Sequence, residues 1–396
     1  MEQTSNVQFR AEKLYKNSRE KFYFLLREIL SNSIQAVIIR KEKEKGNSYY
    51  APELTLEVSL TDKECEIRLW DNGEGFTSLN SRCFDELDRK NEEKEKYNFH
   101  PLGQGRLAII YFTNSAKYET VYKNDAGAFM KKCFPYPKPE EGLFSLADFS
   151  EDASDAKDTY TELKIVIDKQ QQLNRAKTFF KKNKDVSELK QWFIETFFPV
   201  IVSNNDLTVN LVFNDELETV SLKGIELETE KIDFSLSPDG EKQYDFRLWL
   251  IKNNNVSLRG DNTIVCFARN LKAELASGKL TYTIESQEGY LLYLTSDYFD
   301  EYVDTKGESI EVSGEAVNAI KEKIDEVLDQ RFKETIQSNL KVTKQNLKRF
   351  KARFPSLDAF IPEGAFEGCK GIVNEDDIVK TAIETKGSMR NGFGIR

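Results

Sequence analysis

The stretch FLLREILSNSIQAVIIRK (Phe24 to Lys41) decides how the N-terminal part of the chain is expected to fold. Its apolar residues recur at spacings of three and four, which predicts a helix from about residue 19 to 45 with one buried face. That face also carries Glu28 and Asn32, and residues four apart stack on the same side of a helix. A carboxylate and an amide on an apolar face indicate that the helix covers something polar.

The bulk properties of the chain favour a globular protein of more than one domain. Its 396 residues exceed one ordinary core, and 39% hydrophobic, 12% aromatic and 31% charged residues exclude wholesale disorder. The net charge of -10 argues against a basic surface throughout, but it leaves room for a local basic face. Scattered cysteines, an N-terminus unlike a signal peptide and no run near ~18 apolar residues predict a reduced, cytoplasmic protein with no membrane partner.

Alternating patterns place strands in the first part of the chain. They predict a short strand at Val7 to Leu14 and a hairpin of strands at Glu53 to Leu60 and Cys65 to Asp71. A charged segment over residues 77–102 is expected to be a surface loop. A buried helix entering a strand in GRLAIIYFTNSAKYETVYK, and a strand at TYTELKIVID, complete a first domain over residues 1–168.

The pattern changes from about Gln170. Two helices are followed by strands in LTVNLVF, YDFRLWLIK, NTIVCFARN, KLTYTIE and YLLYLTS, which predicts a second α+β domain over residues 169–313. Apolar residues at helical spacing from Val317 to Leu328 then predict a helical tail over residues 314–396. The expected fold class is therefore α+β.

Two glycine motifs follow the first helix. The strand CEIRLWD runs into DNGEGF, with Asp71, Gly73 and Gly75, although DNG alone is a common turn. In HPLGQGRLAII, Gly103 and Gly105 precede a helix, where free backbone amides form an anion site. Each motif is weak alone, but their order along the chain favours a site for a nucleoside triphosphate.

Each part has a physical use in such a site. Asn32 offers an oxygen to a magnesium ion on the phosphates, because this cation prefers oxygen ligands and keeps several waters. Glu28 is placed to take a proton from the attacking water, and general-base help of this kind contributes roughly 10²–10⁴-fold in rate. Asp71 at a strand end accepts from an exocyclic amine such as that of adenine, and Gly73 lets the ring approach the backbone.

The set of motifs resembles the GHKL superfamily of ATPases, which includes DNA gyrase B, the heat-shock-ninety chaperones, sensor histidine kinases, MutL and the MORC proteins. REILSNSIQA is similar to the family's N box, including Arg27, Ser31 and Ala36, and DNGEGF and GQGRLA are similar to its two glycine boxes. TELKI resembles the closing strand, where the family has a threonine near the adenine-binding aspartate. The likeness covers roughly residues 1–170 and implies a Bergerat-fold ATPase domain of helices over a mixed sheet.

The resemblance implies roles for single residues. It implies Glu28 as general base, Asn32 as magnesium ligand and a lid at residues 77–102. It further implies that the nucleotide is contacted by Asp71, Gly73, Gly75, Gly103, Gly105 and Thr161. Arg106 adds charge to the phosphates or is an exposed arginine at a helix start. The chain departs from the family at Gln35, where an aspartate is usual, and at Tyr160, where glycine is usual.

The second domain resembles the transducer of the gyrase, MutL and MORC type, which supplies a lysine to the terminal phosphate. EYVDTKGESIEV is similar to the MutL loop that carries this lysine, which makes Lys306 the candidate. A plain solvated lysine is the alternative reading, and Arg269 or Lys272 would compete for the role.

The resemblance implies a conformational switch that binds and hydrolyses magnesium-ATP. It implies a homodimer that closes through the N-terminal domain, with the segment Val7 to Leu14 exchanged between protomers. We expect a role in DNA-related processes or anti-phage defence, with DNA or a protein as partner. The alternatives are a chaperone-like ATPase acting on protein clients and a scaffold that binds nucleotide without hydrolysis. The basic run KVTKQNLKRFKAR is either a nucleic-acid patch or a solvated helix face.

Overall fold

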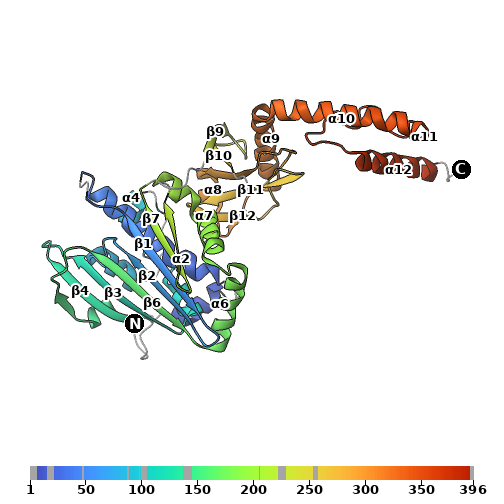
Figure 1. Cartoon of the computed structure of the whole chain (residues 1–396). Coiled ribbons are helices and arrows are strands. Elements are labelled where there is room, and N and C mark those ends of the chain that lie inside the picture. Colours follow the sequence, from blue (N-terminus) through green and yellow to red (C-terminus); the bar gives the residue numbers. More distant parts are fainter. Residues whose placement is uncertain are drawn as a thin grey trace. The chain divides into compact units, whose positions relative to one another are not determined.

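The computed structural model describes residues 7–15, 22–46, 49–86, 89–97, 99, 105–136, 145–204, 206–221, 229–252 and 257–392. The described chain is an α+β protein, as the sequence predicts. It forms two compact units, Met1–Glu226 and Leu227–Arg396 (Figure 1). Among the described helices, none combines the length and the apolar character needed to cross a bilayer.

The first unit is built on one mixed sheet, whose described strands follow the order β5-β4-β3-β6-β2-β1-β7-β8 (Figure 1). The strands are β1 Glu53–Leu60, β2 Cys65–Asp71, β3 Ser115–Lys123, β4 Phe129–Tyr136, β5 Glu151–Ala153, β6 Tyr160–Ile167, β7 Thr208–Phe213 and β8 Glu216–Ser221. All neighbours are antiparallel except β1 and β7, which run parallel. The predicted hairpin of β1 and β2 is confirmed, with Leu54 opposite Asp71.

Besides its sheet, the first unit contains a set of described helices, some of which pack against the strands. They are α1 Val7–Tyr15, α2 Tyr23–Lys43, α3 Ser78–Asp85, α4 Glu92–Lys96, α5 Arg106–Phe112, α6 Gln170–Lys182 and α7 Val186–Ser203. Alternate residues of β2 are buried, and α2 contacts both β1 and β2. Because this alternation includes the last residue of β2, it places Asp71 on the same face as the buried residues of the strand.

The sequence pattern predicts a strand at Val7 to Leu14, and this prediction is wrong because the segment forms helix α1. Its alternation fails at Lys13, while Ala11 and Tyr15 recur four residues apart and are 1% and 3% exposed. Tyr15 packs against Phe24 and Phe112, so the buried face of α1 lies on α2 and α5. Phe9, which a strand would have placed with the apolar set, is 63% exposed.

The first unit extends beyond the boundary expected after residue 168. Helices α6 and α7 and strands β7 and β8 belong to it, and β7 pairs with β1 from Glu53 opposite Thr208 to Val58 opposite Phe213. The expected boundary came from a change in local pattern. A parallel pairing between distant segments leaves no such local signal, and the local pattern therefore places the strand LTVNLVF in the second domain.

The segment expected to be a surface loop at residues 77–102 contains two short helices within its described part. The side chain of Thr77 caps α3, and that of Asn91 caps α4. Asn91 is 4% exposed and donates from Nδ2 to Asn80 Oδ1 at 2.9 Å, which joins the two helices. Phe84 of α3 packs edge to face against Phe76 at a centroid distance of 5.1 Å. These ties make the segment a packed substructure, which we call the lid, comprising the described residues between 77 and 97.

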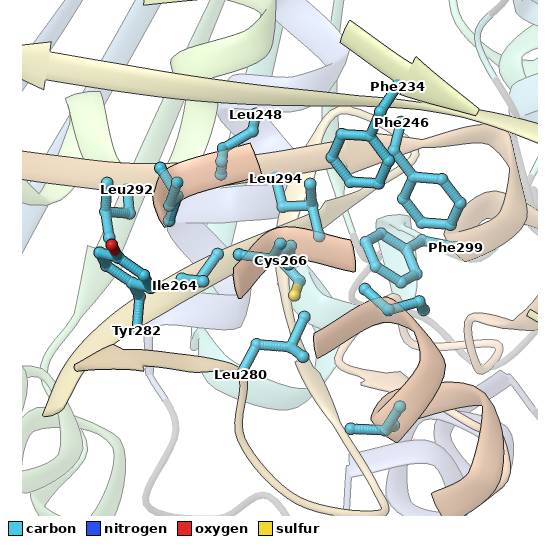
Figure 2. Close-up of a cluster of buried hydrophobic side chains, with 14 of the residues drawn as sticks. Phe234, Phe246, Leu248, Ile264, Cys266, Leu280, Tyr282, Leu292, Leu294 and Phe299 are labelled. Carbon is cyan, nitrogen blue, oxygen red and sulfur yellow. The ribbon is translucent and has the colours of Figure 1, made fainter. Parts of the chain in front are cut away.

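The second unit has its own sheet and core. The described strands follow the order β15-β12-β11-β14-β10-β9, and β13 pairs with β11. They are β9 Thr229–Leu236, β10 Tyr244–Lys252, β11 Asp261–Ala268, β12 Leu271–Leu275, β13 Thr281–Thr283, β14 Tyr290–Ser296 and β15 Ser309–Ile310. Figure 2 shows the core, in which Phe234, Phe246 and Phe299 gather at one end and Tyr282 and Leu292 at the other.

The helices of this unit are α8 Asp297–Tyr302, α9 Gly314–Arg331, α10 Lys333–Arg353, α11 Pro355–Asp358 and α12 Glu375–Gly392. The predicted apolar stripe of α9 is confirmed, because Val317, Ile320, Ile324 and Leu328 are buried in the core of the sheet. Helices α10, α11 and α12 enclose a smaller cluster around Phe350, Val373 and Ile378.

Candidate functional site

Helix α2 carries the carboxylate that the sequence predicts to be a general base. Glu28 is half-buried, and its Oε1 lies 3.3 Å from Nη2 of Arg27. Arg27 is 2% exposed, and its guanidinium lies 4.7 Å from the centre of the Phe24 ring. A charged hydrogen bond to a packed guanidinium limits the orientations open to the carboxylate. Glu28 is therefore held in place and still reaches the surface.

The second glycine motif lies directly against this carboxylate. A Cβ atom on Gly105 would lie 2.6 Å from Oε2 of Glu28 and 3.5 Å from Nδ2 of Asn32. Real Cβ atoms do not approach an oxygen this closely, so a side chain at position 105 would displace Glu28. The start of α5 thus meets the Glu28 and Asn32 pair, as the order of motifs predicts. Gly103 lies outside the described residues.

Asp71 lies at the opposite end of the site. It is 3% exposed, accepts from Ser33 Oγ at 2.7 Å on Oδ2 and accepts from the backbone N–H of Gly73 at 3.0 Å on Oδ1. Burial raises the pKa of Asp71 to about 6, although both hydrogen bonds oppose this shift. At neutral pH the residue is therefore mainly a buried carboxylate, and it is tied to α2 through Ser33.

The turn after Asp71 needs both of its glycines. A Cβ atom on Gly73 would lie 2.6 Å from Cβ of Ala36 and 2.9 Å from its backbone carbon, so the turn packs directly on α2. Gly75 has a φ of +72°, and a Cβ there would lie 2.7 Å from the carbonyl oxygen of Val121. Close packing rather than a generic turn preference therefore explains the spacing of DNGEG.

Hydroxyl groups continue the site across the sheet. Thr161 of β6 lies directly opposite Asp71 of β2, and Thr120 of β3 lies directly opposite Thr161. The Oγ1 atoms of Thr120 and Thr161 are 3.3 Å apart. The backbone N–H of Phe76 donates to Thr120 Oγ1 at 3.3 Å. Three neighbouring strands thus present a row of polar groups on the face that carries Asp71.

A buried arginine of α2 binds backbone carbonyl groups of the turn. Arg40 of α2 is 7% exposed and donates from Nη1 to the carbonyl oxygens of Asn72 at 2.7 Å and Thr159 at 3.3 Å. Thr159 Oγ1 in turn donates to the carbonyl oxygen of Gly73 at 2.7 Å. Since the carbonyls of the turn are fixed to α2 and to Thr159, the residue before β6, the position of Asp71 is set by several independent bonds.

The lid contributes a lysine that no sequence motif marks. Lys94 of α4 donates from Nζ to Asn32 Oδ1 at 2.9 Å. Removal from water lowers the pKa of Lys94 to about 8, although Cys83, Glu28 and Asp71 oppose this shift through their charges. Lys94 lies in the run KNEEKEKY, where nothing distinguishes it from Lys90 or Lys96. The only local signal is Asn91, a favourable N-cap for a short helix.

A second lysine joins the lid to α2. Nζ of Lys43 lies 2.6 Å from Glu74 of the turn and also forms an ion pair with Glu93 of α4. The lid is therefore bound to α2 at two places, by Lys94 to Asn32 and by Glu93 to Lys43. Both contacts are polar, and one of them uses the amide that was predicted to hold a metal.

Two further predicted residues are described by their own surroundings. Arg106 donates from Nη1 to the carbonyl oxygen of Cys83 at 3.4 Å, and its guanidinium lies 5.5 Å from the centre of the Phe84 ring, so it contacts α3. Lys306 is half-buried in the second unit, in the turn between α8 and β15. The backbone N–H of Gly307 closes this turn onto the carbonyl oxygen of Asp304 at 3.0 Å.

Comparison with known proteins assigns no relative to the chain: no family model matches it, and a search of curated proteins returns no significant match. In the described residues, no three or more His, Cys, Asp or Glu side chains form a group suited to a metal ion. The site is therefore defined by the contacts around α2 alone. Those contacts bring together Glu28, Asn32, Asp71, Gly73, Gly75, Gly105 and Thr161, with Lys94 as an addition.

Proposed function

We propose that the first unit binds magnesium-ATP and hydrolyses it, as a conformational switch of the GHKL type with a Bergerat fold. The observation that carries the proposal is that one helix, α2, meets both glycine motifs. Gly105 lies against Glu28 and Asn32, and the turn with Gly73 lies against Ala36, next to Ser33 and Asp71. A site with an anion-accepting end and a buried acceptor at the other end suits a nucleoside triphosphate.

Asp71 supplies the base-recognition end in this proposal. Its carboxylate oxygens already accept from Ser33 and Gly73, and each oxygen retains a further lone pair. An exocyclic amine, as in adenine, donates to such an oxygen. Gly73 and Gly75 leave no side chain between the backbone and the ring, and Thr161 adds a hydroxyl on the adjacent strand. The rigid turn therefore favours one orientation of the base.

The other end suits phosphates and Mg²⁺. Asn32 Oδ1 already accepts from a cation, Lys94 Nζ, so this oxygen is placed to serve a positive charge. Mg²⁺ is usually held by one or two protein oxygens together with phosphate oxygens and water, which matches a single amide ligand. Bound there, it would neutralise charge on the phosphates. Gly105 leaves room for the phosphates beside Glu28.

Glu28 is the general base of the proposed hydrolysis. Arg27 fixes its Oε1, which leaves Oε2, the atom nearest to Gly105, to take a proton from water. Lys94 leaves Asn32 when the nucleotide arrives and places its charge on a phosphate oxygen, so the lid follows the nucleotide. Lys306 remains the candidate for a second lysine at the terminal phosphate.

The switch is proposed to act as a homodimer that closes when ATP binds, in DNA-related processes or defence against phage. Exchange of an N-terminal strand over Val7 to Leu14 is not part of the proposal, because this segment is helix α1 and is packed on α5. Closure would instead join surfaces of the first unit around the lid.

The test measures steady-state ATP hydrolysis of the wild type, Glu28→Ala and the control Glu42→Ala. Glu42 lies on the same helix and pairs with Lys45. We expect Glu28→Ala to lose at least about 100-fold in turnover while nucleotide binding persists. Glu42→Ala should match the wild type, and a non-hydrolysable analogue should double the mass in light scattering. A wild type that binds ATP but never hydrolyses it, with DNA present or absent, would establish the scaffold alternative.

A further inference from the structure

Helix α10 carries a local excess of positive charge on a chain whose net charge is -10. From Lys341 to Arg353 it contains six basic residues and no acidic residue. The site of the first unit does not account for this run. Such segregation of charge favours a partner of opposite sign.

Acidic neighbours compensate only part of this charge. Lys351 pairs with Asp358 at 2.7 Å, and Arg353 pairs with Glu375 at 3.0 Å. The remaining four, Lys341, Lys344, Lys348 and Arg349, are exposed and form no ion pair with any described residue. We call these four residues the basic face of α10.

The opposite side of α10 is fixed by packing. Asn339 donates from Nδ2 to the carbonyl oxygens of Glu285 at 2.7 Å and Lys370 at 2.8 Å, and Phe350 is fully buried in a cluster with α11 and α12. Lys341, Lys344 and Lys348 follow at spacings of three and four, so they stack along one side of the helix. The helix therefore displays its lysines as a rigid row that points away from its own core.

We propose that the basic face of α10 binds the phosphate backbone of double-stranded nucleic acid. Seven residues of α-helix rise about 10 Å, so the three lysines extend over a length comparable to a few phosphates of a duplex. Lysines bind phosphates as point charges and read no base. The expected binding is therefore independent of sequence and sensitive to salt.

The surroundings of this face favour a duplex over other anionic partners. The apolar side of α10 already packs within its own unit, so the helix has no free apolar face to insert into a lipid surface. The exposed residues of α10 between positions 341 and 353 include no aromatic side chain on which single-stranded bases would stack. What the face offers is charge in a row, which matches a regular phosphate backbone.

This inference rests on the proposed function in one respect, because it names a surface for the DNA partner. Its test is carried out without ATP. We would titrate the full chain with a fluorescent 30-base-pair duplex, as the probe, over a range of salt concentrations. One variant, the α10 variant, combines the three substitutions Lys341→Glu, Lys344→Glu and Lys348→Glu. The control combines Lys63→Glu, Lys117→Glu and Lys169→Glu, which changes the net charge equally at exposed positions of the first unit.

Four neutralised phosphates predict a slope of log K against log salt of about -3.6 for the wild type. We expect the α10 variant to weaken binding at least about 10-fold and to lose most of this slope, while the control stays within about 3-fold of the wild type. Equal loss in both variants, absence of wild-type binding at low salt, or equally tight binding to anionic vesicles would overturn the proposal. Circular dichroism melting confirms that both variants fold. A wild type that does not hydrolyse ATP would contradict the proposed function but would leave the proposal of duplex binding by α10 standing.

Discussion

The turn at Asp71 to Gly75 and the lid both lie against helix α2, but they are attached to it differently. The turn is held by buried contacts, with Gly73 packed on Ala36 and its carbonyl bonded to Thr159. The lid is attached to α2 by polar contacts of Lys94 and Glu93, and an aromatic contact, from Phe84, is with Phe76 rather than with α2. Buried packing has one arrangement, whereas a lysine exchanges partners at low cost. One side of the site is thus built to be constant and the other to respond to what binds.

The largest effect is expected from the constant side. Gly73→Val would push a side chain into Ala36, and overpacking of this kind costs typically about 1–3 kcal/mol. Because the turn also positions Asp71, nucleotide binding should be lost. Chemical denaturation and binding of a fluorescent ATP analogue measure both effects. Gly368→Ala is the control, because a Cβ there would have no atom within 4 Å. Normal binding by Gly73→Val would show that the turn is not part of the site.

Asp71→Asn should separate stability from binding. The folded-state pKa of Asp71 is about 6 and the ordinary value is 3.8, so the folded protein binds more protons between these values. The stability that this protonation contributes is present below about pH 3.8 and is lost as the pH rises through about 6. At pH 7 the buried charge of Asp71 therefore lowers the free energy of unfolding. The difference between the two pKa values corresponds to about 3 kcal/mol at pH 7. Because Asn replaces the two hydrogen bonds of the carboxylate only in part, the free energy of unfolding should rise by about 1–2 kcal/mol.

The same variant should weaken ATP about 10- to 100-fold, since a hydrogen bond to a charged acceptor is lost. Thermal melts at pH 5 and pH 7, with calorimetric binding at pH 7, test both effects. In the variant, the difference between the two melts should shrink. Lower stability at pH 7 together with unchanged ATP affinity would contradict the role of Asp71.

The lid should give the smallest effect and a distinct signature. The pKa of Lys94 is about 8, below the ordinary value of 10.5, so about half of these amines are neutral at pH 8. A phosphate beside Lys94 would raise this pKa, and nucleotide binding should then take up about half a proton at pH 8. Calorimetry in buffers of different ionisation enthalpy measures this uptake.

Lys94→Met should abolish the proton uptake and weaken ATP about 10-fold, without loss of stability, because a partly buried charge is replaced by an apolar side chain. Lys96→Met is the control, as Lys96 lies on the same helix and is exposed. Uptake that persists in Lys94→Met would place the titrating group elsewhere.

Much of the constant side could be predicted from the sequence, whereas the responsive side could not. Residues of the turn are adjacent in the chain, and alternation in β2 points Asp71 to the buried face. Glu28 and Asn32 are four residues apart, so helix geometry places them on one face. Lys94 reaches Asn32 across 62 positions, and a surface run with several lysines gives no sign of which one turns inward. Helix α1 is missed for a different reason. Within its few residues the alternating pattern of a strand competes with the four-residue spacing of Ala11 and Tyr15, and a segment this short does not decide between them.

The parallel pairing of β1 with β7 can form only late in the synthesis of the first unit, because the two strands are far apart in the sequence. When the ribosome has finished β6, β1 is still an open edge with a row of unpaired amides and carbonyls. The sheet is protected only after α6, α7 and β7 have emerged. A fragment ended at residue 168 would keep the motifs of the site but expose this edge, and we expect it to aggregate, whereas a fragment ended after β8 should stay dispersed.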